Sequence, residues 1–406
     1  MVPPMLHAGH FQRAYERFWR NPHATSLLWI SILFSLLSTS MFQQKSRAAA
    51  LGQQTAPPPW PSPADRIAAF STMAYRCLEA GEYLAGKPHS VEATLLYGMH
   101  LVLQKRDVDP VCWHMLSTAV RLAQRMGYHR DASHLARDVE PALSAFEAEM
   151  RRRTWYTLEY FDVVYSFQLG VPPVIQPSDV DTCLPANLRD DEFDELDSEH
   201  HNGDQRLQQK LDRARHPASS SSSLLEFTPI LGFIYYARQI QLLRRVVQQA
   251  LAVNPPPTYG DVRRLDADLR ALHADIPPSL RYRPVRESGF ADSPDVIMRR
   301  LVCEVMYLKS LCVLHRRYLL RGWTGTPANA DFGASSVGGV YAASRRTCCE
   351  AALGLLDLQA EFDEHSSEPG ARLYERRYIL TNTGYHDFLL AVMCLCLDLT
   401  AATGDG

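Results

Sequence analysis

The sequence predicts an all-α fold, a large array of helices in two packed lobes without a regular sheet. Apolar residues recur at three- and four-residue steps along most of the chain, and strand-like alternation is nearly absent. The breaks between these periodic segments are rich in proline and glycine, which interrupt helices. With 406 residues, the chain is long enough to bury more than one hydrophobic core.

The periodic segments fall into an N-terminal and a C-terminal group. The first group is predicted to form helices at 11–20, 25–41, 64–82, 91–103, 111–126 and 146–169. The second group is predicted to form helices at 224–251, 261–273, 294–320, 341–362 and 374–400. A proline-rich connector at 53–63 and a glycine-rich loop at 322–339 interrupt the two groups.

The segment between the groups, 197–223, has few apolar residues and ends in a serine run. Such composition is typical of disordered linkers, because too little apolar surface is available to offset the entropy of ordering. We therefore expect a first helical part at 1–196, a disordered linker at 197–223 and a second helical part of the same region at 224–406.

Charge and cysteine content exclude several classes of protein. The formal net charge is −3 and no basic patch is visible, so the chain carries no electrostatic footprint for nucleic acid. Nine scattered cysteines include no CxxC pair, so the spacing of a tetrahedral zinc site is absent. Most of these cysteines lie in apolar helical segments, as reduced buried thiols do, which favours a reducing compartment.

One apolar segment, 26–41, follows three arginines and could be mistaken for a membrane or signal segment. It contains six serine and threonine residues and is shorter than the roughly 20 residues that a membrane span needs. We interpret it as a buried core helix; a membrane or signal segment is the alternative.

The predicted helix at 111–126 is apolar except for one narrow polar stripe, so it should be buried on most sides. Gly127 stands where a left-handed C-terminal cap is expected. The following string His129-Arg130-Asp131 occurs in kinase catalytic loops, but those loops need asparagine where this chain has Ala136. A helix cap with local ion pairs is the better interpretation.

The predicted helix at 146–169 carries three adjacent arginines, 151–153, which cannot share one face because they spread around about 200° of the helix. We expect them to connect neighbouring helices rather than to bind phosphate. Further along, Asp162 falls on an aromatic face beside Tyr165, where a buried carboxylate needs a partner. Arg121 and His129 are the predicted partners. These four residues are our candidates for a core ion pair or for an effector pocket.

Several strings occur in an order that resembles one family. They are HFQRAYERFWRNP, LLWISILFSLL, YRCLEAGEY, VEATLLYGMHL, AVRLAQRMGYHRD, FEAEMRRRTWYTLEYFD, DVDTCLPANLRD and LCVLHRRYLL. Together they resemble the regulatory middle homology domain of fungal zinc-cluster transcription factors. The last string departs from the family pattern, because Arg317 stands where proline is usual.

The resemblance implies a non-enzymatic regulator of RNA polymerase II transcription in a fungal nucleus, responsive to a signal or a small-molecule effector and able to form homo- or heterodimers. In this family a zinc cluster N-terminal to the domain contacts DNA. That cluster is missing from this sequence, so we expect no zinc or other cofactor here. DNA would be reached only through a missing domain or a partner protein. A truncated gene model and a standalone regulatory domain both stay open.

Two other classes remain as alternatives. A helical enzyme would use Asp162, Tyr165 and His129, although the sequence shows no nucleophile elbow, metal-ligand pair or phosphate loop. A membrane-associated or scaffold protein would use the apolar segment 26–41. The resemblance implies no membrane.

Overall fold

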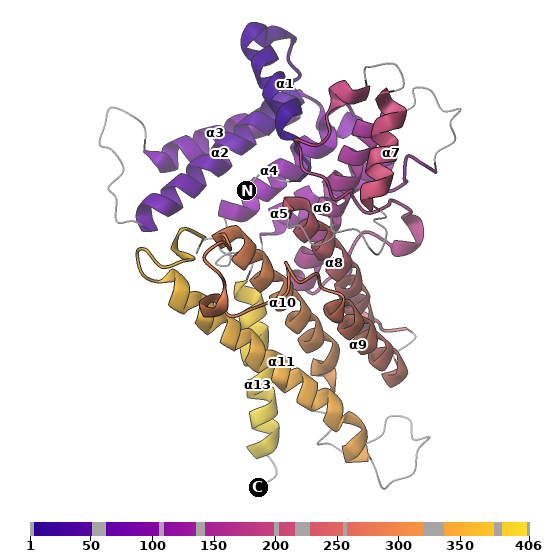
Figure 1. Ribbon diagram of the computed structural model, residues 1–406, viewed down its shortest axis with the longest axis vertical. Helices are drawn as coiled ribbons and strands as arrows, with labels where there is room; N and C mark the ends of the chain where they lie inside the picture. The colour runs from indigo at the N-terminus through magenta and orange to yellow at the C-terminus, as the bar shows by residue number, and fades with distance from the viewer. Residues whose placement is uncertain are drawn as a thin grey trace. The chain divides into compact units, whose positions relative to one another are not determined.

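Regular structure in the described part of the chain is entirely helical, which confirms the predicted all-α class (Figure 1). The computed structural model describes residues 4–50, 62–104, 109–134, 143–198, 203–215, 228–254, 258–319, 337–376 and 384–403.

The chain divides into two compact units. Unit 1 comprises Met1–Leu169 and Pro173–Ala237, and unit 2 comprises Gly170–Pro172 and Arg238–Gly406. The division falls inside one helix, α8 (Pro229–Leu251), and so lies beyond the segment 197–223 that the sequence indicates as a linker.

Helices before α8 build unit 1: α1 (Ala8–Arg20), α2 (Leu27–Ala50), α3 (Pro63–Ala80), α4 (Ser90–Gln104), α5 (Pro110–Arg125), α6 (Ala145–Leu169) and α7 (Gly203–Arg215). Helices after α8 build unit 2: α9 (Tyr259–Ala274), α10 (Pro294–His315), α11 (Val337–Ser366) and α13 (Tyr385–Thr403). Three helix starts share one local signal. Ser62, Asp109 and Ser293 each cap a backbone N–H, and each is followed by a proline, whose fixed φ suits the first helical position.

Helices α2 and α3 lie side by side, joined by serine hydroxyls (Figure 1). Ser31 Oγ donates to the Ala74 carbonyl at 2.8 Å, and Ser38 Oγ donates to the Ile67 carbonyl at 2.9 Å. Within the described residues, only the stretch Leu27–Ser46 is long and apolar enough to cross a membrane by length and composition. Its buried serines bind another helix of the same unit, which favours the core-helix interpretation.

The structure corrects the prediction of a disordered linker at 197–223. Residues 203–215 form α7, and Leu207 and Leu211 lie fully inside a core cluster with Phe146 and Phe193. Two leucines one turn apart are enough to bury this helix, although its average composition is strongly polar. The rest of the predicted linker falls largely outside the described residues.

In unit 2, α10, α11 and α13 pack together. A buried ion pair joins two of them, with Lys309 Nζ 2.7 Å from Asp387 Oδ1. The predicted helix 374–400 is wrong at its start, because Tyr374–Arg376 forms a 3₁₀ turn and α13 begins at Tyr385. The loop calls at 53–61 and 322–336 lie outside the described residues.

The crossing of α4 and α5 depends on the absence of a side chain at Gly98. A Cβ atom there would lie 3.0 Å from Cδ2 of Leu116, a fully buried residue. We predict that Gly98→Val lowers the free energy of unfolding by about 1–3 kcal/mol through overpacking. The matched change Gly260→Val, at an exposed helical site whose Cβ would meet nothing closer than 3.6 Å, should shift it by less than about 0.5 kcal/mol. Urea unfolding measures both, and equal losses would contradict the packing argument.

Candidate functional site

The turn after α5 places a loop against α6. Gly127 has φ +79°, and the N–H of Tyr128 donates back to the Ala123 carbonyl at 2.9 Å. Only glycine adopts this backbone without strain, so the predicted left-handed cap is confirmed. The reversal carries Asp131, four residues beyond the cap, to the side of α6.

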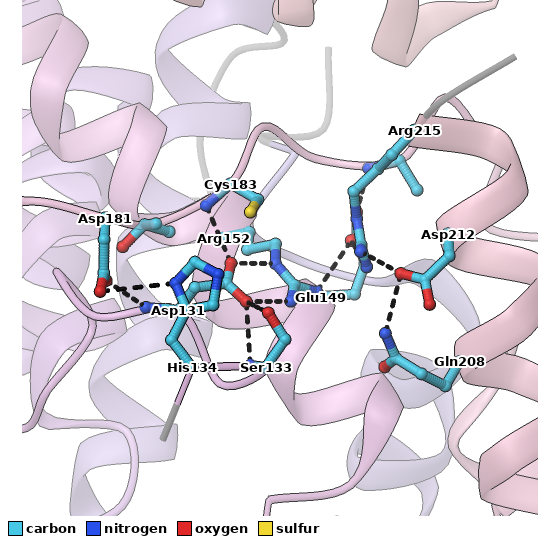
Figure 2. A network of polar contacts seen from close by, with 12 residues as sticks. Asp131, Ser133, His134, Glu149, Arg152, Asp181, Cys183, Gln208, Asp212 and Arg215 are labelled. Carbon is cyan, nitrogen blue, oxygen red and sulfur yellow. Dashed lines mark hydrogen bonds and ion pairs between the residues drawn. The ribbon is translucent and has the colours of Figure 1, made fainter. Parts of the chain in front are cut away.

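Asp131 is the centre of a buried polar network (Figure 2). Arg152 donates to it twice, from Nε at 2.7 Å and Nη2 at 2.6 Å, and both side chains are at most 2% exposed. Ser133 donates from its N–H and its hydroxyl, and the N–H of Cys183 donates at 2.8 Å. Burial alone would raise the pKa of Asp131, but the hydrogen bonds from Arg152 and Ser133 outweigh it and hold that pKa far below its usual value.

A second carboxylate, Asp181, joins the same loop to the segment 179–190. It accepts from the Asp131 N–H at 2.7 Å and from Arg130 Nε at 3.0 Å, and its own N–H donates to the His129 carbonyl. His134 Nδ1 lies 3.5 Å from the Asp181 carboxylate. Asp181 therefore forms the partly exposed rim of the network.

The network continues along α6 through Glu149, which is completely buried. One of its oxygens accepts from Arg153 Nε at 3.3 Å and from the Ala186 N–H at 2.9 Å. Arg152 Nη1 and Arg215 Nη2 lie 3.8 and 3.6 Å from the other oxygen (Figure 2). Burial raises the pKa of Glu149, and the three guanidinium groups oppose that shift. Arg215 thereby attaches α7 to this network.

The three adjacent arginines of α6 point to different partners, as predicted. Arg153 donates to Asp190 at 2.8 Å and to the Leu188 carbonyl at 2.9 Å. Arg151 donates to the Met126 carbonyl at 3.2 Å and lies 4.7 Å from the centre of the Tyr128 ring. Because Arg152 and Arg153 are buried, the triplet offers no phosphate-binding patch.

Unit 1 also contains a cavity of about 440 Å³, within the size range of small-molecule pockets. Its walls come from α1, α2, α6 and the ends of α4 and α5. Most lining side chains are apolar or aromatic, and Arg151 and Tyr128 join them. The cavity and the ion network therefore share helix α6.

The structure corrects the pairing that the sequence predicts for Asp162. This buried carboxylate accepts from the N–H groups of Val174 and Ile175, both at 2.9 Å, and so orders the chain after α6. Arg121 is exposed and donates to Gln124 at 3.1 Å, so it does not pair with Asp162. Backbone donors thus take the place of the expected partners, Arg121 and His129.

The two other predicted site residues lie apart from the cavity. The His129 ring packs 6.1 Å from the Trp155 ring, and its Nδ1 is buried without a hydrogen-bond partner among the described residues. Tyr165 is buried, and burial raises its pKa. None of the four predicted residues lines the cavity. Asp131 and Glu149 were not among the predicted site residues. The signal for Glu149 was its spacing from the arginines three and four residues later.

Comparison with known proteins places this sequence among transcription regulators. The sequence pattern described as "Fungal specific transcription factor domain" matches residues 3–250. The chain is 33% identical to the Zn(2)-C6 fungal-type transcription factor pigI of Monascus ruber, covering 98% of this chain and 43% of that protein. It is 30% identical to the equisetin cluster transcription factor eqxF of Fusarium heterosporum, covering 100% of this chain and 52% of that protein.

Another relative is the fusarisetin A cluster transcription factor fsa6 of a Fusarium species, 30% identical over 100% of this chain and 48% of that protein. The chain thus spans about half the length of the curated relatives it matches. No solved structure matches it.

Arg152 and Arg130 provide a matched test of the network, since both are arginines that pair with an aspartate of the same region. We predict that Arg152→Met lowers the free energy of unfolding by about 3–5 kcal/mol, because it leaves a buried carboxylate without its counter-ion. Arg130→Met, at a half-exposed site, should cost less than about 1 kcal/mol. Chemical denaturation of both variants measures the difference, and similar losses would refute the ranking.

The pH dependence of stability tests the charge on Asp131. Its folded pKa is depressed, so its contribution is complete above the unfolded pKa of about 4 and is lost as the pH falls toward the folded value. The free energy of unfolding of the wild type should therefore decrease once the pH is lowered past about 4. Asp131→Asn should start from a lower stability and lose less of it over this window. A variant with the same acid slope as the wild type would exclude Asp131 as the cause.

Proposed function

This chain belongs to the family of fungal specific transcription factor domains, and we propose that it is the regulatory region of a nuclear transcription factor that controls one gene cluster in response to a small-molecule effector. DNA is read by another domain or by a partner protein. The observation that carries the proposal is similarity over almost the whole chain, including both units, to relatives named as cluster transcription factors.

The charge distribution supports a regulatory role rather than direct DNA contact. Proteins that bind DNA present clustered lysine and arginine to its phosphates. In the most concentrated basic motif, at 151–153, Arg152 and Arg153 are buried in ion pairs and Arg151 donates to a backbone carbonyl. The net charge of −3 adds no general attraction to nucleic acid. The basic side chains of α6 therefore support the fold of the domain.

One arrangement of side chains in unit 2 resembles the catalytic residues of a hydrolase. His315 Nδ1 lies 2.9 Å from Ser344 Oγ and its Nε2 lies 3.2 Å from Asp266 Oδ1. A catalytic serine must be exposed beside donors for the oxyanion. Ser344 lies inside α11 and is 2% exposed, and its Oγ is hydrogen-bonded to the Tyr259 hydroxyl at 3.0 Å. This arrangement is better explained as a polar connection between α9, α10 and α11.

Deletion of the gene tests the proposed function. We predict that the transcripts of one contiguous group of genes change together, in the direction set by the sign of the regulator, while the rest of the transcriptome changes little. Reintroduced wild type and Arg130→Met should restore the pattern, whereas Arg152→Met should restore it only in part, because it strongly destabilises unit 1. RNA sequencing of the four strains measures this. Unchanged transcripts throughout the genome after deletion would reject a role in transcription.

A further inference from the structure

We propose that the cavity of unit 1 is a binding site for a neutral, mainly apolar small molecule whose carbonyl or hydroxyl group hydrogen-bonds to His89. The inference rests on the proposed function in one respect: that function makes the bound molecule the effector of the regulator. Binding itself is a property of the chain, so it can be tested separately.

The walls of the cavity fit an apolar ligand body. Phe11 and Trp29 are stacked with ring centres 5.6 Å apart, and Phe146, Met126 and Met150 line the same space. Aromatic rings give large contact areas, and methionine side chains adapt to irregular ligand shapes. A volume of about 440 Å³ lined by such side chains suits a small organic molecule.

Two histidines of the cavity are already occupied by the protein. His7 donates from Nε2 to the Phe193 carbonyl at 2.8 Å and accepts the His10 N–H on Nδ1, so both ring nitrogens are used. His10 contacts the Glu195 carboxylate through Nδ1. His7 and His10 therefore serve as parts of the cavity wall.

His89 differs from them in two respects. Among the residues that the structure describes, no group hydrogen-bonds its ring; Glu92 and His10 act on it only through their charge. Its backbone lies in the left-handed region, with φ +71°, where a residue with a Cβ atom is strained. Such strain is found where function requires a particular side chain in a particular place. The imidazole offers a donor and an acceptor to the cavity.

The charges around the cavity select a neutral ligand. Burial lowers the pKa of His89, so its ring is uncharged near neutral pH. Arg151 is the cation in the lining, while Glu92 and Glu147 are the carboxylates. Glu92 accepts the Tyr128 hydroxyl at 2.8 Å and stays close to the ring of His89. An anionic ligand would be repelled by these two carboxylates, whereas a carbonyl or hydroxyl can bond to His89 without burying a new charge.

A bound molecule would contact the residues that adjoin the ion network. Arg151 lines the cavity, and the next residue on α6, Arg152, holds Asp131. Tyr128, three residues before Asp131 in the sequence, also lines the cavity, and the guanidinium group of Arg151 lies over its ring. A ligand that packs on Arg151 and Tyr128 therefore contacts both supports of the loop 127–134.

Fluorescence titration of the whole 406-residue chain tests the site with two defined probes. The neutral naphthyl ketone prodan should bind saturably, and the anionic probe anilinonaphthalene sulfonate should not displace it. Met150→Trp, which fills the cavity, should abolish the saturable signal. His89→Gly should weaken prodan binding about five- to tenfold through loss of one hydrogen bond. It should also raise the melting temperature, because glycine removes the backbone strain.

Two further variants are controls. Glu82→Gly relieves a left-handed residue with φ +56° outside the cavity, so it should leave prodan binding unchanged. His89→Asn, whose side chain tolerates this backbone and still hydrogen-bonds, should retain most of the affinity. Unchanged binding in both His89→Gly and Met150→Trp, or displacement by the anionic probe, would overturn the site. In that case a gene cluster that still responds to deletion would leave the proposed function standing.

Discussion

The bidentate pair between Arg152 and Asp131 is the interaction on which most of unit 1 depends. It buries two opposite charges at 2.6 and 2.7 Å, in a place where either charge alone would be strongly unfavourable. Asp131 can reach this position only because Gly127 reverses the chain after α5. The same carboxylate accepts the N–H of Cys183, so the segment 179–190 is ordered by the pair as well.

Helix α6 connects this pair to the other features of the unit. Its consecutive arginines are divided between the cavity wall, the loop after α5 and the segment after residue 187. Glu149, one turn earlier, gathers the guanidinium groups of Arg152, Arg153 and Arg215. Buried polar networks of this kind are costly when incomplete, so they favour one arrangement of the helices around them.

The helices and the family resemblance were predictable because both are local in the sequence. Apolar periodicity predicted the position of almost every helix. The place of Gly127 directly after a helix predicted its left-handed backbone conformation. The failures were non-local. Leu207 and Leu211 bury α7 only because Phe146 and Phe193 lie opposite, which composition does not show. Asp162 was expected to pair with Arg121 or His129, but backbone N–H groups bind it instead, and their position depends on the fold of the segment after α6.

The candidate site was less predictable than the fold for the same reason. His89 lies in a loop without periodicity, and its strained backbone is visible only in three dimensions. The cavity is lined by residues that are spread between Met5 and Thr154 in the sequence, so no single string of residues marks it. By contrast, the division of the three arginines among different partners was foreseeable from geometry, because three adjacent helical residues cannot face one surface.

A double-mutant cycle between Asp131 and Arg152 tests the central claim most directly. Unfolding free energies of the wild type, Asp131→Asn, Arg152→Met and the double variant give the coupling energy of the pair alone. If the pair organises unit 1, the coupling energy should be about 2–3 kcal/mol, and the double variant should be little worse than Arg152→Met alone. Additive losses with a coupling energy near zero would show that the two residues stabilise the unit independently and would contradict the account.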